Sequence, residues 1–246
     1  MSENLPMKWE DELSKEAKEV ARNERTAITQ ISLRSGMMAY RGVAIPGNKL
    51  ECVIIASAIE RRYDTQKFDS DNIRPPDCFA LSVSGVEMEP HEDAPNKQSA
   101  KCADCPMNAW QPNPDRKGKN HKPCKERRRI ALIPVDAVKS GQTRGAELAM
   151  IAIPVTSVKH WAAYVNRTSA EFNRPPWGLI TEIAVTPHAQ NQFEVKFRPI
   201  DVLTEDDLPH VYARIQNGKD AVLTPYDSSG YMVPEDAPKD KKPAKY

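Results

Sequence analysis

The stretch that decides the fold is Leu50-Glu-Cys-Val-Ile-Ile-Ala-Ser-Ala-Ile-Glu-Arg-Arg-Tyr63, an apolar, partly β-branched run that becomes charged at its end. Residues of this kind favour a strand. The segments 28–33 (ITQISL) and 37–46 (MMAYRGVAIP) predict two further strands before it, and Pro46-Gly47-Asn48 predicts the turn that leads into it. Cys52 lies inside the apolar run, so we expect a buried thiol there and not a metal ligand.

Downstream, the apolar patterns alternate between strands and helices. Strands are predicted at 129–133 and 147–153, and a hairpin at 179–185 and 193–197 with one buried face. Helices are predicted over 8–25, after Thr156 or Ser157, and from Thr204. Strands dominate, which predicts a mainly β fold with helical additions (α+β), such as an oligonucleotide-binding (OB)-like antiparallel barrel with an inserted zinc-binding loop.

The same patterns suggest three parts of the chain. We expect an N-terminal helical arm over 1–27, an OB-like core domain over 28–216 with a Cys-rich insertion at 69–129, and a polar, Pro-rich tail over 217–246. An insertion of that length without apolar periodicity would be unusual in a compact domain unless a metal organised it.

Composition excludes several classes of protein. The chain has 246 residues, of which 39% are apolar and 28% charged, and no apolar run approaches the roughly 20 residues that span a bilayer. The N-terminus lacks the apolar core of a secretory signal, so we expect a cytoplasmic protein without a membrane partner. The formal net charge of +1 argues against a uniformly basic protein, but it leaves room for a local basic patch.

Cysteine spacing points to zinc. Four of the five cysteines fall in the predicted insertion, and Cys102-Ala-Asp-Cys105 forms a C-x2-C pair whose thiolates can reach one ion from a tight turn. No second pair exists, so two single cysteines must complete the site. The expected ligands of a structural Zn²⁺ are Cys78, Cys102, Cys105 and Cys124, and His91 or His121 could replace either single cysteine.

Enzymatic alternatives find little support in the sequence. The segment His91-Glu92-Asp93 misses the H-x-E spacing of zinc deaminases, and Lys101 stands where these enzymes have proline before the first cysteine of the pair. The chain contains no nucleophile elbow, phosphate-binding P-loop or H-E-x-x-H motif. We therefore do not expect an enzyme, although a metal-dependent nuclease remains a distant alternative.

A basic run overlaps the end of the insertion. Residues 116–129 contain eight Lys and Arg and one Glu, a formal charge of +7 in a chain of +1. Such a segment is typical of phosphate binding, and stacking aromatics would add affinity for single strands. A solvated loop is the alternative. The residues considered for contact with nucleic acid are Lys117, Lys119, Lys122, Lys125, Arg127, Arg128, Arg129, Arg41, Arg61 and Arg62, with Tyr40, Tyr63, Phe68, Phe79 and Trp110 as stacking platforms.

The chain resembles a family of tailed-phage proteins across roughly residues 28–200. The segments that carry the resemblance are Cys102-Ala-Asp-Cys105-Pro-Met-Asn-Ala-Trp110, the Gly118-Lys119 to Cys124-Lys125 stretch, and Arg128-Arg129-Ile130-Ala131. It implies a phage single-stranded DNA-binding protein with an OB barrel and a zinc-bearing insertion. Gln111-Pro112 departs from the Gly-Ser that is usual after the tryptophan in this family.

The resulting expectation is sequence-independent binding of single-stranded DNA during replication or recombination, in the cytoplasm of a bacterial host. The alternative is a regulatory protein whose zinc loop binds a host protein such as a polymerase or nuclease. Replication and recombination proteins are further expected partners.

Overall fold

The computed structural model describes residues 28–66, 74–114 and 117–226, together with Trp9, Glu12, Leu13 and Glu16 near the N-terminus. The expected helical arm over 1–27 lies outside the described residues except for those four positions. The same is true of Phe68 and of residues 227–246 of the expected tail.

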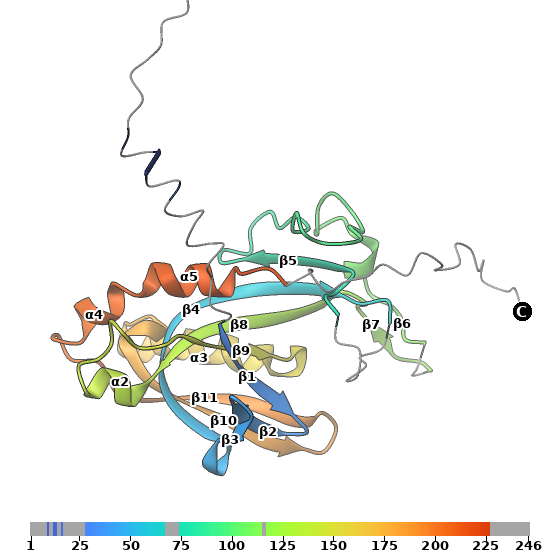
Figure 1. The fold of residues 1–246 in the computed structure, drawn as a ribbon. Helices are drawn as coiled ribbons and strands as arrows, with labels where there is room; N and C mark the ends of the chain where they lie inside the picture. Colours follow the sequence, from blue (N-terminus) through green and yellow to red (C-terminus); the bar gives the residue numbers. More distant parts are fainter. Residues whose placement is uncertain are drawn as a thin grey trace, which may run out of the picture.

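One curled sheet forms the body of the molecule (Figure 1). Its strands are β1 (Thr29–Arg34), β2 (Met37–Tyr40), β3 (Val43–Ala44), β4 (Lys49–Tyr63), β5 (Cys78–Ser82), β8 (Lys125–Pro134), β9 (Ala149–Ile153), β10 (Leu179–His188) and β11 (Gln192–Val202). Their order across the sheet is β11-β10-β4-β8-β9-β1-β2-β3, and β5 pairs with the far end of β4. The β1–β9 pair is parallel and the other pairs are antiparallel.

Strand β4 owes its continuous apolar run to burial on both faces. Cys52 and Ile54 point into one hydrophobic core, while Val53 and Ile55 point into a second core on the opposite face. Because successive side chains of a strand alternate between the two faces, both sets must be apolar. The register with β8 shifts between Ile54 and Ala56, where a bulge adds to the bend of the strand.

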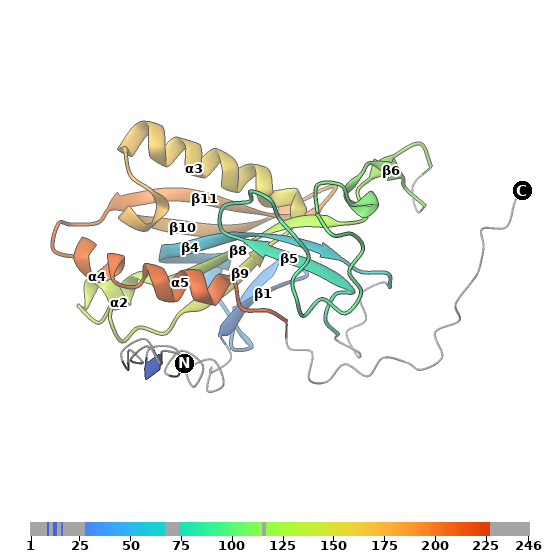
Figure 2. The same ribbon diagram turned by 90° about the horizontal axis from the view of Figure 1, so that it is seen from above.

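Helices cover the two faces (Figure 2). Helix α3 (Val158–Phe172) lies on the face of the first core, where Trp161 and Tyr164 pack against Phe197 of β11. The helices of the other face are α2 (Val135–Lys139), α4 (Leu208–Tyr212) and α5 (Ile215–Val222). The predicted helix from Thr204 is therefore two short helices.

The polar tail expected from residue 217 begins later, because the chain stays on the sheet as far as Tyr226. The predicted tail starts at Asn217-Gly218, but Gly218 lies inside α5, where an added Cβ atom would lie 2.5 Å from Ile55 Cγ2. The glycine permits close approach of helix and strand. Gly218 therefore allows α5 to pack closely on β4, and it does not end the helix.

The Cys-rich insertion is also shorter than predicted. Residues 78–82 and 125–129, at the two ends of the range 69–129, belong to strands β5 and β8 of the main sheet. Between them lie loops and a two-stranded hairpin, β6 (Gln111–Pro112) and β7 (Asn120–His121). The charged residues at the start of β8 do not predict a strand, because Glu60, their carboxylate partner on β4, lies far away in the sequence.

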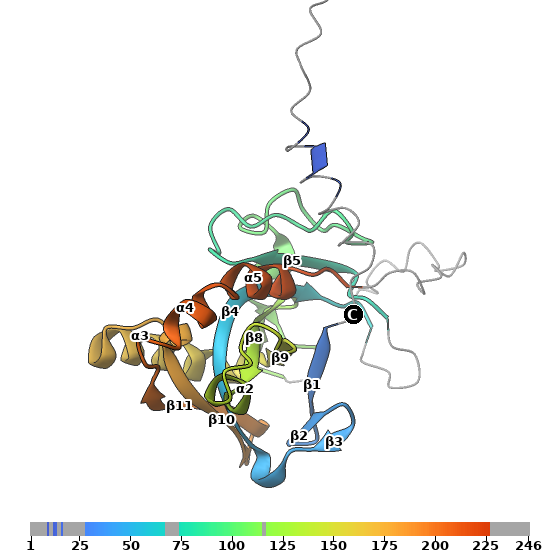
Figure 3. The ribbon, with the colours of Figure 1, turned by 60° about the vertical axis from the view of Figure 1, so that its left-hand side comes forward.

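At the level of fold class, the molecule is mixed α/β with a half-barrel sheet, in agreement with the predicted mainly β fold with helical additions (Figure 3). None of the helices in the described part of the chain is long and apolar enough to span a membrane.

Candidate metal centre and nucleic-acid interface

The four cysteines of the predicted ligand set line a single small cavity of about 20 Å³. Cys78 begins β5, Cys102 and Cys105 lie in the loop that follows it, and Cys124 immediately precedes β8. A cavity of this volume has room for about one water-sized particle. The fold thus brings all four thiols from three separate segments to a space that suits a single ion.

Backbone hydrogen bonds hold the cysteine segments in place. The 3-10 helix Pro106–Asn108 follows Cys105, and the Asn108 side chain donates a 3.0 Å hydrogen bond to the Cys102 carbonyl. The Cys102 amide donates to the Met88 carbonyl at 2.9 Å, and the Cys124 amide donates to the Met107 carbonyl at 2.8 Å. The hydrogen bond from the Asn108 side chain to Cys102 explains why an asparagine suits this position of the C-x-x-C-P-x-N segment.

The thiols of Cys78, Cys102 and Cys124 favour the protonated form in the protein alone. Burial, reinforced by the three other thiols, raises the pKa of Cys124 to about 12. Burial also raises the pKa of Cys78 and Cys102, while the neighbouring Arg61 partly opposes the increase at Cys102. Since thiolates are the form that binds zinc, metal binding here would release protons.

The four cysteines share a cavity, but their side chains are not arranged as ligands of one ion. Within residues 28–66, 74–114 and 117–226, no three His, Cys, Asp or Glu side chains already stand as a set of metal ligands. Rotation about a Cα–Cβ bond moves a cysteine sulfur without moving the backbone.

The two alternative ligands and the fifth cysteine lie elsewhere. His91 does not line the cavity; its ring stacks on Phe79 at 5.0 Å between centroids, and its Nδ1 accepts a 3.1 Å hydrogen bond from the Asp93 amide. His121 lies in β7, also outside the cavity lining. Cys52 is fully buried in the first core, as predicted, and burial strongly raises its pKa.

The five arginines of the paired strands β4 and β8 interact with carboxylates of the protein itself. Arg129 donates to Glu60, Arg128 to Glu126 and Arg62 to Asp64, while Arg127 lies 3.7 Å from Glu60 and Arg61 lies 3.8 Å from Glu126. Arg129 is only 4% exposed. The five arginines share three carboxylates, Glu60, Glu126 and Asp64, which offset part of the positive charge of these two strands.

Tyr226 joins this charged cluster, a role that sequence analysis missed because the residue falls in the expected tail. Its hydroxyl donates to Glu60, and its ring lies 4.7 Å from the Arg129 guanidinium and 5.4 Å from that of Arg62. The ring also packs edge-on against Phe79, which is buried and unavailable as a stacking platform. The only sequence signal for this role of Tyr226 was its position shortly after an apolar helical pattern.

Tyr40, Arg41 and Tyr63 lie apart from the hairpin. Arg41 pairs with Glu147 at 2.5 Å, and its guanidinium lies 5.5 Å from the centre of the Tyr40 ring, near the sheet edge formed by β3. Tyr63 ends β4 and lines the cysteine cavity.

The β6–β7 hairpin carries the remaining predicted contacts. Trp110 precedes β6 and is 69% exposed, and Lys122, which follows β7, places its Nζ 5.7 Å from the centre of the indole ring. The register of Gln111 with His121 places these two residues opposite each other. Lys117, Lys119 and Lys125 are exposed nearby in the sequence. An aromatic platform and lysines thus occur together on a hairpin that is attached next to Cys105 and Cys124.

Comparison of the chain with protein-family models, curated proteins and solved structures found no match.

Proposed function

We propose that the protein binds single-stranded DNA without sequence preference through the β6–β7 hairpin, and that a structural Zn²⁺ held by the four cysteines supports this hairpin. The observation that carries the proposal is the exposed Trp110 with Lys122 beside its ring. A base can stack on an exposed indole whatever its identity, and lysines can hold the adjacent phosphates.

Zinc would act here by fixing the loops and not by chemistry. Residues 83–124 contribute few large apolar side chains to the cores, with Met88 and Cys102 in a small cluster beside Ile59 and Ala80. Four thiolates around one ion would link β5, the Cys102–Cys105 turn and the start of β8. The hairpin between the last two segments would then have a rigid base.

The ion pairs described above narrow the proposed contact set. Lys117, Lys119, Lys122, Lys125 and Trp110 form its centre, because the arginines of β4 and β8 already have carboxylate partners. Tyr40 and Arg41 lie near the other edge of the sheet, and Arg41 already pairs with Glu147, so they stay outside the centre of the contact set.

The wider setting follows from the family resemblance. We propose a phage-type protein that acts in replication or recombination in the cytoplasm of a bacterial host, together with proteins of those processes. An OB-like role for the curled sheet belongs to the same proposal, as does the absence of an enzymatic activity.

Titration of labelled oligo-dT at several salt concentrations tests this function. If at most four lysines contact phosphates, the slope of log K against log salt should not be steeper than about −3. Trp110→Ala should weaken binding by about tenfold, since stacking contributes about 1–3 kcal/mol per base. Trp9→Ala is the matched control, because Trp9 is equally exposed, at 69%. Absence of binding, or an affinity indifferent to salt, would refute the proposal.

A second candidate function is binding of a host protein through the zinc loop. Val83 and Val86, in the segment after β5, are 47% and 72% exposed, which suits a protein partner better than a phosphate backbone. A pull-down from host lysate with and without nuclease distinguishes the two functions. Capture of a defined partner that survives nuclease and is lost in Val86→Asp favours the protein partner.

A further inference from the structure

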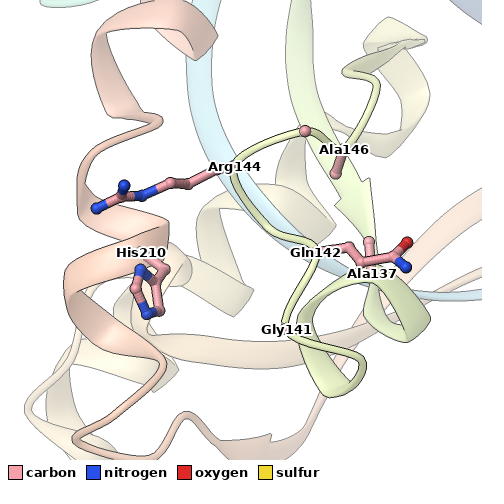
Figure 4. Close-up of a pocket in the computed structure, with 7 residues that line it drawn as sticks. Ala137, Gly141, Gln142, Arg144, Ala146 and His210 are labelled. Carbon is pink, nitrogen blue, oxygen red and sulfur yellow. The ribbon is translucent and has the colours of Figure 1, made fainter.

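A cavity of about 550 Å³ lies at the end of the molecule that carries α2 and α4 (Figure 4). This volume lies within the range of small-molecule sites, roughly 300–1,000 Å³. Its lining residues are Ala137, Gly141, Gln142, Arg144, Gly145, Ala146 and His210. They come from α2, from the loop between α2 and β9, and from α4.

The cavity is rich in donors and lacks carboxylates. Its described lining residues include Arg144 and His210, and none of them is Asp or Glu. In the described part of the chain, neither of these two side chains makes a hydrogen bond or ion pair with the protein. Figure 4 shows the Arg144 side chain extending towards α4, near His210. Both side chains are thus available to an anionic ligand.

The loop that carries Arg144 is fixed from behind. Arg214 donates hydrogen bonds to the carbonyls of Thr143, Arg144 and Ala146 at 2.6, 2.8 and 2.9 Å. The Gln142 amide donates to the Ala137 carbonyl at 2.8 Å. A loop held in this way presents its donors without paying a large ordering cost on binding. The guanidinium of Arg214 adds positive charge behind it.

We propose that this cavity binds a small phosphate monoester of nucleotide size. Arg144 would hold the phosphate through its forked N–H groups, and His210 would donate from its imidazole. The small apolar residues Ala137 and Ala146 would contact the uncharged part of the ligand. The site does not depend on DNA binding, because α2 and α4, which contribute to its lining, lie at the opposite end of the molecule from the β6–β7 hairpin (Figures 1 and 2).

Calorimetric titration of the full chain with AMP, adenosine and inorganic phosphate tests the proposal. AMP should bind saturably and at least tenfold more tightly than adenosine, since the phosphate makes the charged contacts. Arg144→Gln should weaken AMP binding about tenfold, as expected for loss of one charge-assisted contact. Lys139→Gln is the matched control, because it removes a charge from α2 without changing the cavity lining. The affinity of this variant for AMP should stay within about twofold of that of the unmodified chain.

Three outcomes would overturn the proposal: no saturable AMP binding at millimolar concentration, equal affinity for AMP and adenosine, or equal affinity of Arg144→Gln and the unmodified chain. In an NMR titration with AMP, chemical-shift changes should be confined to residues 137–146 and 210. Trp110→Ala should leave AMP binding unchanged. That last variant separates this site from the proposed DNA interface.

Discussion

The Arg129 guanidinium donates two hydrogen bonds, 3.0 and 2.8 Å long, to the same oxygen of Glu60, and both side chains are almost completely buried. The pair joins β4 to β8 beside the segment that leads to the cysteine cavity. Charges removed from water to this degree need a partner, so the pair helps to hold β4 and β8 together at this point.

Glu60→Gln should lower the free energy of unfolding by about 3–5 kcal/mol, because it leaves Arg129 and Arg127 without a compensating charge in a buried position. Urea unfolding at neutral pH measures the difference. Glu51→Gln, an exposed change in the same strand, is the control and should alter stability by less than about 0.5 kcal/mol. Equal effects of the two variants would show that the Glu60 charge is not needed.

The same pair predicts a pH dependence. Burial alone would raise the pKa of Glu60, but Arg129, Arg127 and the Tyr226 hydroxyl lower it on balance. A depressed carboxyl pKa contributes stability above the ordinary value, about 4.3, and loses that contribution as pH falls through the folded-state pKa. The stability gap between the unmodified chain and Glu60→Gln should therefore narrow below about pH 4. A gap that widens on acidification would contradict this assignment.

Cys105→Ser should reduce bound zinc to near zero and expose residues 78–124 to protease, since three thiolates cannot complete the proposed site. Metal analysis and limited proteolysis of the purified protein measure both effects. Cys52→Ala, which removes the buried thiol of the first core, should retain zinc. Full zinc content in Cys105→Ser would show that the ligand set is wrong.

Lysines and arginines of the basic run should differ in their effect on DNA affinity. Lys119→Gln should weaken oligo-dT binding and reduce the salt slope by roughly 0.7, the contribution of one phosphate contact to a single strand. Arg128→Gln should change affinity little, because Arg128 is engaged by Glu126 at 3.0 Å. A larger loss of affinity for Arg128→Gln would place the phosphates along β8 instead of the hairpin.

Gly218→Ala should destabilise the protein, although alanine is the better helix former. Its Cβ would approach Ile55 Cγ2 to 2.5 Å and Ala56 Cβ to 3.1 Å, and relief of such overlap costs about 1–3 kcal/mol. Asn217→Ala, at the exposed neighbouring position of α5, should be neutral or slightly stabilising. Thermal unfolding of both variants would decide, and a more stable Gly218→Ala would refute the close contact.

Short-range patterns were sufficient for most of the sheet. The strand around Cys52, the 179–197 hairpin and the helix after Ser157 all occur where the apolar patterns indicated, because burial of one or both faces leaves a local signature. The C-x2-C pair likewise identified a turn that brings its cysteines to one cavity. These features depend on neighbours within a few residues.

Charged positions were harder to interpret. Arg127, Arg128 and Arg129 suggested a phosphate-binding surface, whereas in the structure they pair with Glu60 and Glu126. Similarly, the sequence predicted a tail from Asn217-Gly218, whereas Gly218 lies inside α5, where Ile55 leaves no room for a larger side chain. For Arg127, Arg129 and Gly218 the deciding partner lies on β4, and its position depends on how the elements pack.

The sequence by itself determined the mainly β character of the chain, the burial of Cys52 and the candidate zinc ligands, because each depends on local composition or spacing. Only the tertiary structure decided which basic residues remain free. Pairing of β4 with β8 brings Arg127 and Arg129 to Glu60, while the hairpin leaves Trp110 exposed with Lys122 beside its ring. A charge counted along the chain becomes available to a ligand only after the fold has assigned its carboxylate partners.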